Sequence, residues 1–258
     1  MLLSLPFYII VLVAFLKKER TYIPSGYHYT WAVIMGLVGY YMSSLFDFIG
    51  LQYVSAGIER IILFIYPTLA VFINYLIFKQ RIDKRQIAAI VVTYIGIGIA
   101  YWGEMKQLKN GPHFLYGSFM VLLCGITYAI YLVGTGKLIP QLGANQYTSI
   151  AMLAATAGIF THYIITQDLS LLYNYLNPIN PIFYYILALA LIATVIPSFL
   201  LSKGMQRIGS NDLAIVTSIG QVATLFQANV LLHERFSLVQ ALGTGMVIMG
   251  VLLVKKSK

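Results

Sequence analysis

Three charged residues stand inside apolar stretches of this sequence, where charge is costly. Asp47 lies near the end of one apolar segment, and Glu59 and Arg60 lie at the start of the next. A charge at membrane depth costs about 3 kcal/mol or more unless it is paired or faces water. Two interpretations follow: a structural ion network that joins two helices, or a site that binds substrate or a proton.

A second group of residues falls on one face of the helix that follows. At about 3.6 residues per turn, positions three or four apart share a face. One such face carries a cation, an aromatic ring, a proline and an amide: Arg60, Phe64, Pro67 and Asn74. A proline inside a helix removes one backbone hydrogen bond, so Pro67 provides either a hinge or a packing kink. We expect this face to line a cavity.

Further polar groups lie inside other apolar segments. Gln221 is placed to hydrogen-bond a substrate or another helix. Tyrosine combines an apolar ring with a hydroxyl, which suits either an amphipathic ligand or helix packing. The candidates of this kind are Tyr40, Tyr128 and Tyr131.

The composition places these residues in a membrane protein. Hydrophobic residues make up 59% of the 258 residues, charged residues make up 10%, and the mean hydropathy is +0.81. Too little polar surface remains to cover a water-soluble globule. The formal charge of +9 is carried at helix ends rather than on a basic surface, so nucleic acid is not an expected partner.

Continuous apolar runs predict membrane helices, because backbone groups in lipid must be paired within each segment. The sequence therefore predicts an all-α integral membrane fold with about nine transmembrane helices. We place them near 2–16, 30–51, 57–78, 86–103, 114–134, 146–166, 182–202, 213–232 and 237–254.

The distribution of positive charge predicts the orientation. Thirteen Lys and Arg residues fall in one set of alternating loops and the C-terminus, and three fall in the other set. Positive residues near helix ends stay on the cytoplasmic side. We therefore expect a cytoplasmic C-terminus with a basic tail at 255–258 and an external linker at 104–113.

An internal repeat appears when residues 50–98 are laid on residues 204–252 without a gap. Eight of 49 positions match at this offset of 154, among them Gly50 with Gly204 and Arg81 with Arg235. The two matched loops fall on opposite sides of the membrane by the charge count, so the repeats are predicted to be inverted. Inverted repeats support transport by alternating access.

Two stretches of the chain carry a family resemblance. They are GLQYVSAGIERIILFIYPTLAVF with KQRIDKRQ, and GMQRIGSNDLAIVTSIGQVATLF with HERFSLVQALGTGMVIMGVLL. Each resembles the repeat of the EamA-type transporters of the drug/metabolite transporter superfamily. The resemblance assigns the first repeat to 1–103 and the second to 114–254. It implies a ten-helix fold, of which the first helix is expected to be missing here.

The same resemblance implies a function and a location. It implies a secondary transporter that exports a small organic metabolite, such as an amino acid, another metabolite or a drug, across the cytoplasmic membrane of a prokaryote. Proton coupling follows if Asp47 or Glu59 titrates, and facilitated diffusion follows if both stay paired with Arg60. The alternative is an accessory subunit that does not transport, and both a monomer and a homodimer remain open.

The sequence indicates no catalytic or cofactor site. The single cysteine, Cys124, excludes an intrachain disulfide and a thiolate metal cluster. The four histidines are scattered, and no HExxH, CxxC or phosphate-loop pattern occurs. We expect neither an enzyme nor a bound metal or cofactor.

Overall fold

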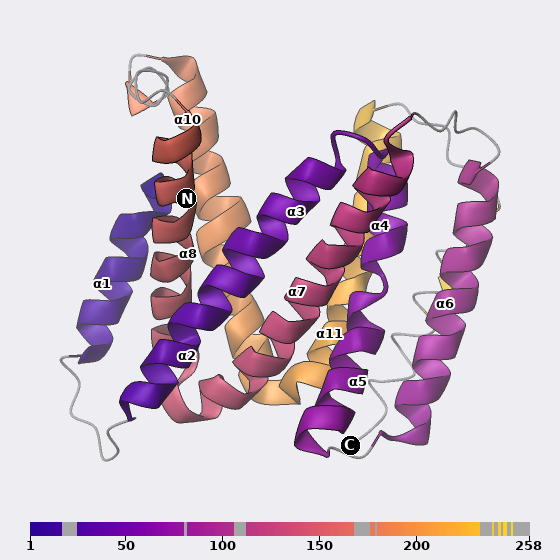
Figure 1. The fold of residues 1–258 in the computed structure, drawn as a ribbon, viewed down its shortest axis with the longest axis horizontal. Coiled ribbons are helices and arrows are strands. Elements are labelled where there is room, and N and C mark those ends of the chain that lie inside the picture. Colours follow the sequence, from indigo (N-terminus) through magenta and orange to yellow (C-terminus); the bar gives the residue numbers. More distant parts are fainter. Residues whose placement is uncertain are drawn as a thin grey trace. The chain divides into compact units, whose positions relative to one another are not determined.

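The computed structural model describes residues 1–16, 25–79, 82–105, 112–167, 176–178 and 180–232, with single positions at 239, 242–243, 245–246 and 249. In residues 101–105 and 221–232 only the backbone is described. Within these ranges every regular element is a helix (Figure 1). The predicted all-α class is therefore confirmed for the described part of the chain.

Several of these helices suit a membrane. Four stretches are long and apolar enough to cross one: Gly26–Gly50, Phe114–Leu142, Ala144–Thr166 and Pro181–Ala214. Two shorter apolar helices cover Leu2–Phe15 and Tyr66–Phe78. The chain is thus a multi-pass helical membrane protein. The number of nine spans stays a prediction, since most of 237–254 lies outside the described residues.

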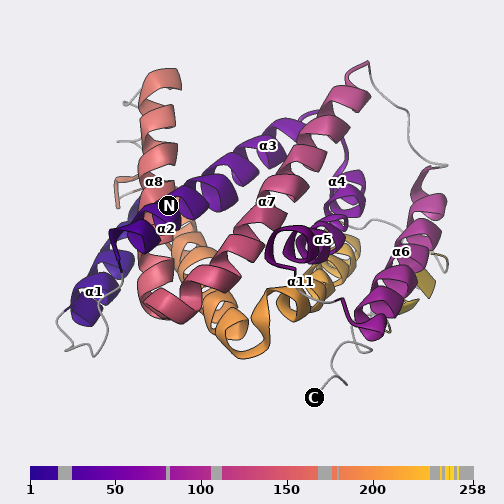
Figure 2. The same ribbon diagram turned by 60° about the horizontal axis from the view of Figure 1, so that its bottom comes forward.

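The first of two compact units comprises Met1–Tyr41 and Gly134–Gly209. Its main helices are α1 (Leu5–Leu16), α2 (Gly26–Gly36), α8 (Ala144–Thr166), α10 (Pro181–Ala188) and the first part of α11 (Ile196–Leu232). Helix α8 packs against both α1 and α2 (Figures 1 and 2). The approach to α2 is close because Gly36 has no side chain where it meets the backbone of Ala151.

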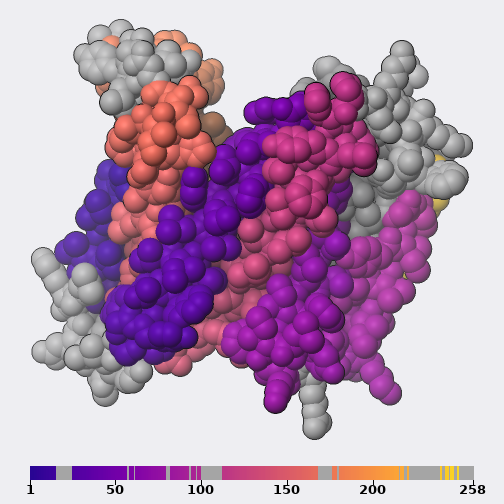
Figure 3. Space-filling view, viewed as in Figure 1, coloured from indigo at the N-terminus to yellow at the C-terminus, as the bar shows by residue number. Residues whose placement is uncertain are grey.

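The second unit comprises Met42–Val133 and Ser210–Lys258. It holds α3 (Ser43–Gly50), α4 (Ala56–Leu63), α5 (Tyr66–Phe78), α6 (Lys84–Met105), most of α7 (Phe114–Leu142) and the second part of α11. The surfaces of α3 and α7 adjoin in Figure 3, and Gly50 and Gly117 pack directly against the opposing helix. Each unit therefore takes residues from both predicted repeats.

The structure corrects the predicted span at 57–78, which is not one continuous helix. It is divided into α4 and α5 by a turn at Phe64–Ile65. Pro67 lies in the first turn of α5, where a helix needs no N–H from that position. The proline deprives the Leu63 carbonyl of its usual helical donor, so the helix breaks here rather than bending.

A second break falls inside α11, at Gly209. Its φ of 79° and ψ of 173° are not helical. A side chain is strained at such a positive φ, whereas glycine adopts it freely. Gly209 therefore separates the predicted spans at 182–202 and 213–232.

Candidate functional site

The three charged residues singled out by sequence meet in the second unit. Glu59 lies in the first turn of α4 and is 9% exposed. Ser55 caps this helix, its Oγ accepting a hydrogen bond of 3.3 Å from the Ile58 N–H. The charges of both Asp47 and Arg60 act on Glu59. We call these three residues, Asp47, Glu59 and Arg60, the charged cluster.

One member of the charged cluster has an unsatisfied oxygen. The Cys124 thiol hydrogen-bonds the Asp47 carboxylate, and Ser43 Oγ lies 3.2 Å from Cys124 Sγ. One carboxylate oxygen, Asp47 Oδ1, is buried without a hydrogen-bond partner in the described part of the protein. Buried polar atoms are nearly always bonded in folded proteins, so an exception points to a missing ligand, proton or water.

Three tyrosines of the second unit stack on one another. The rings of Tyr66 and Tyr128 are 5.1 Å apart and perpendicular, and those of Tyr128 and Tyr131 are 5.8 Å apart. The hydroxyl groups of Tyr66 and Thr217 are 3.0 Å apart, so this stack joins α5, α7 and α11. Tyr66 and Tyr131 are buried, which gives the stack a packing role, while half-buried Tyr128 retains an accessible face.

The residues at the break between α4 and α5 are also buried. Phe64 is 3% exposed, and Pro67 is buried. Both residues are therefore buried within the second unit, Phe64 in the turn and Pro67 in the first turn of α5, so they do not share one continuous helix. That they line a cavity stays a prediction.

A network of hydrogen-bonded polar side chains lies towards the end of α5. Asn74 is fully buried, and its Nδ2 donates to Ser210 Oγ at 3.0 Å and to Asn211 Oδ1 at 2.6 Å. Gln86, on α6, donates to Asp212 Oδ1 at 3.2 Å. We call these five residues the amide network. It fastens α5 and α6 to the part of α11 that follows Gly209.

Two other predicted site residues belong neither to the charged cluster nor to the amide network. Tyr40 belongs to the first unit, where it packs against the buried cluster of Tyr8, Met152 and Val195. The side chain of Gln221 lies outside the described residues. For Tyr40 the surroundings favour the packing interpretation that sequence left open.

Sequence reasoning missed the polar neighbours of these residues. Ser43 and Asp47 are four positions apart, a spacing that places both on one helix face and could have indicated the shared contact with Cys124. No local pattern pairs Tyr66 with Thr217, which are 151 residues apart in the chain.

Long apolar helices that enclose charged and aromatic side chains define the class of this protein as an integral membrane protein. The chain belongs to the EamA-like transporter family, whose sequence profile matches residues 1–102 and 115–255. The resemblance stated from the sequence is thereby confirmed.

Individual relatives agree with this family assignment. The chain is 30% identical to "Uncharacterized transporter YcbK" of Bacillus subtilis, over 81% of this chain and 67% of the relative. It is 23% identical to "Uncharacterized transporter YetK" of the same organism, over 85% and 66%. The matches thus span about two thirds of the length of these relatives.

A solved structure shares the fold. It is titled "Crystal structure of protein", and it superposes with a TM-score of 0.71 over 97% of this chain and 84% of that chain. The two sequences are 14% identical, so the likeness concerns the fold alone.

Proposed function

We propose that this protein is a secondary transporter that exports a small organic metabolite, with the charged cluster as its binding and coupling site. The observation that carries the proposal is the unsatisfied Asp47 Oδ1 beside the buried Glu59. A purely structural ion network saturates its carboxylates, because an unpaired buried acceptor costs about 1 to 3 kcal/mol. A site that takes up a ligand or a proton leaves one carboxylate oxygen without a partner.

The chemistry of the charged cluster suits an amino acid, another polar metabolite or a cationic drug. Its carboxylates can accept hydrogen bonds from an ammonium group, and Arg60 can donate to a carboxylate. The half-buried ring of Tyr128 offers an apolar surface in the same unit. The proton is the proposed coupling ion, because two neighbouring carboxyls in a poorly solvated site favour sharing one proton.

Alternating access by two inverted repeats is the proposed mechanism. The π-helical segments Leu37–Met42 and Leu189–Val195 support it, because the offset of 154 carries 37–42 onto 191–196. The same offset carries the break at 51–55 onto 205–209, which ends at Gly209. Two irregularities at equivalent positions are expected of a repeated architecture. We further propose a cytoplasmic C-terminus in a prokaryotic cell membrane.

The test is thermal stabilisation of the detergent-purified protein against amino acids, nucleosides, sugar nucleotides and cationic drugs. A ligand at 100 times its dissociation constant adds about 2.7 kcal/mol, which raises the melting temperature measurably. A stabilising ligand that also exchanges across the membrane of reconstituted vesicles supports the proposal. If no compound of the panel stabilises the protein, this substrate class is contradicted. The alternative function, a non-transporting accessory subunit, is then favoured.

A further inference from the structure

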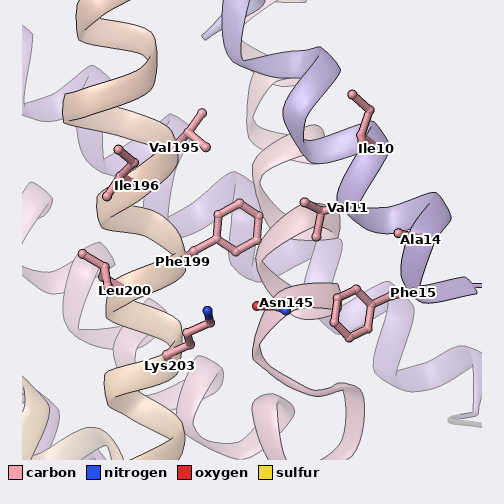
Figure 4. Close-up of a pocket in the computed structure, with 10 residues that line it drawn as sticks. All are labelled: Ile10, Val11, Ala14, Phe15, Asn145, Val195, Ile196, Phe199, Leu200 and Lys203. Atoms are coloured by element: carbon pink, nitrogen blue, oxygen red, sulfur yellow. The ribbon is translucent and has the colours of Figure 1, made fainter. Parts of the chain in front are cut away.

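The first unit has a groove between α1 and α11 that the proposed transport site does not use. It has a volume of about 450 Å³. Its walls are apolar side chains such as Val11, Ala14, Phe199 and Leu200, and Figure 4 shows Lys203 and Asn145 together at one end. The groove is therefore amphipathic along its length.

The polar end of this groove lacks an internal counter-charge. Lys203 is exposed and belongs to the apolar stretch Pro181–Ala214. Within the described ranges, no ion pair or hydrogen bond engages the Lys203 ammonium or the Asn145 side-chain amide. A lysine at the end of a membrane span requires a counter-ion or contact with the aqueous interface.

We propose that this groove, the α1–α11 groove, binds one anionic phospholipid. An acyl chain lies along Val11, Ala14 and Phe199, and the phosphate meets Lys203 Nζ and the Asn145 amide. Basic pockets between membrane helices bind acidic lipid head groups in this manner. Charge complementarity selects this occupant, because a zwitterionic lipid offers the lysine no net negative charge.

The sequence adds two further points in favour of an anionic lipid. Lys17 and Lys18 directly follow the last residue of α1, the helix that forms one wall. Lys203 is also among the basic residues that the charge count assigns to the cytoplasmic side, whose leaflet carries the anionic lipids.

Native mass spectrometry of the purified chain tests this proposal without reference to transport. Phosphatidylglycerol and phosphatidylcholine with identical acyl chains are titrated in one preparation. We expect one phosphatidylglycerol to bind about fivefold more tightly or better, the preference that one lysine provides at a lipid surface. Equal binding of the two lipids overturns the proposal.

Three variants locate the lipid. Lys203→Gln is expected to abolish the preference between head groups, and Ala14→Phe, which fills the groove, is expected to weaken both lipids. Lys84→Gln, the same change at an exposed lysine of the second unit, is expected to leave both unchanged. The proposal is overturned if Lys203→Gln still prefers phosphatidylglycerol. It is also overturned if the wild-type protein is observed as a dimer that carries no lipid. If Ala14→Phe does not fold, Lys203→Gln decides.

Discussion

The charged cluster and the amide network belong to the same unit but differ in the charge of their side chains and in the helices that they join. At the start of α4, Glu59 and Asp47 are close enough to interact, and Asp47 Oδ1 has no partner among the described residues. Towards the end of α5, Asn74 donates through Nδ2 to two partners on α11, and its Oδ1 also has no partner among the described residues. The charged cluster gathers two carboxylates and a guanidinium around an unpaired acceptor, which suits binding, whereas the bonds donated by Asn74 and Gln86 fasten α5 and α6 to α11.

The amide network also adjoins a break in its helix. Ser210 and Asn211 directly follow Gly209, whose positive φ interrupts α11. The bonds from Asn74 therefore fix the start of the helix after this break. The comparison indicates that the two groups have separable roles. The charged cluster binds, and the amide network positions the helix.

The largest expected effect comes from Arg60→Ala. Arg60 is half-buried and its charge acts on Glu59. Removing a charge that would contact the ligand in such a poorly solvated site costs about 2 kcal/mol or more, which is about 30-fold in ligand affinity. The neighbouring carboxyls can take up a proton, so we expect the folded yield to stay near that of the wild type. Ligand-dependent stabilisation measures the first effect and size-exclusion chromatography the second. Loss of folded protein supports a structural ion network instead.

Glu59→Gln keeps the shape of the side chain and removes its charge and its proton. A hydrogen bond to a charged group contributes about 1.5 to 3 kcal/mol, so ligand affinity is expected to fall about tenfold or more. Export is also expected to lose its response to an imposed proton gradient in reconstituted vesicles. Asp83→Asn, at an exposed carboxyl outside the charged cluster, is the matched control. An unchanged gradient response contradicts coupling at Glu59.

Asn74→Leu is expected to affect stability but not ligand affinity. Ser210 and Asn211 lose their donor, which costs about 2 kcal/mol, or about 4 to 8 °C in melting temperature for a chain of this size. The stabilisation added by ligand is expected to equal that of the wild type. A lost ligand response with unchanged melting temperature assigns binding to the amide network and reverses the comparison.

Tyr66→Phe is expected to have the smallest effect. It removes the hydroxyl that lies 3.0 Å from Thr217 Oγ1, while Thr217 keeps its bond to the Leu213 carbonyl at 2.9 Å. A loss of about 1 kcal/mol in stability follows. Tyr75→Phe, at a tyrosine that is 50% exposed, serves as the control. An equal effect in both variants shows that the bond to Thr217 contributes nothing.

The sequence predicts helices and their membrane setting because these depend on local composition and hydropathy. It also predicts that Asp47, Glu59 and Arg60 come together, since two consecutive apolar segments must return to the same membrane surface. The division of 57–78 depends on how the turn at Phe64–Ile65 packs, which Pro67 alone does not reveal. The bonds of Asn74 to α11 cross more than 130 residues of sequence, beyond the reach of any local pattern.

Cys124 provides the most direct test of the charged cluster, since it is the only cysteine in the chain and its thiol bonds to Asp47. The measurement is the rate at which N-ethylmaleimide alkylates the wild-type protein, with and without the ligand identified by thermal stabilisation. Cys124→Ser and the denatured wild type set the limits of no labelling and full labelling. If the ligand binds at the charged cluster, labelling slows severalfold in its presence. An identical rate with saturating ligand places the binding site elsewhere and contradicts the account.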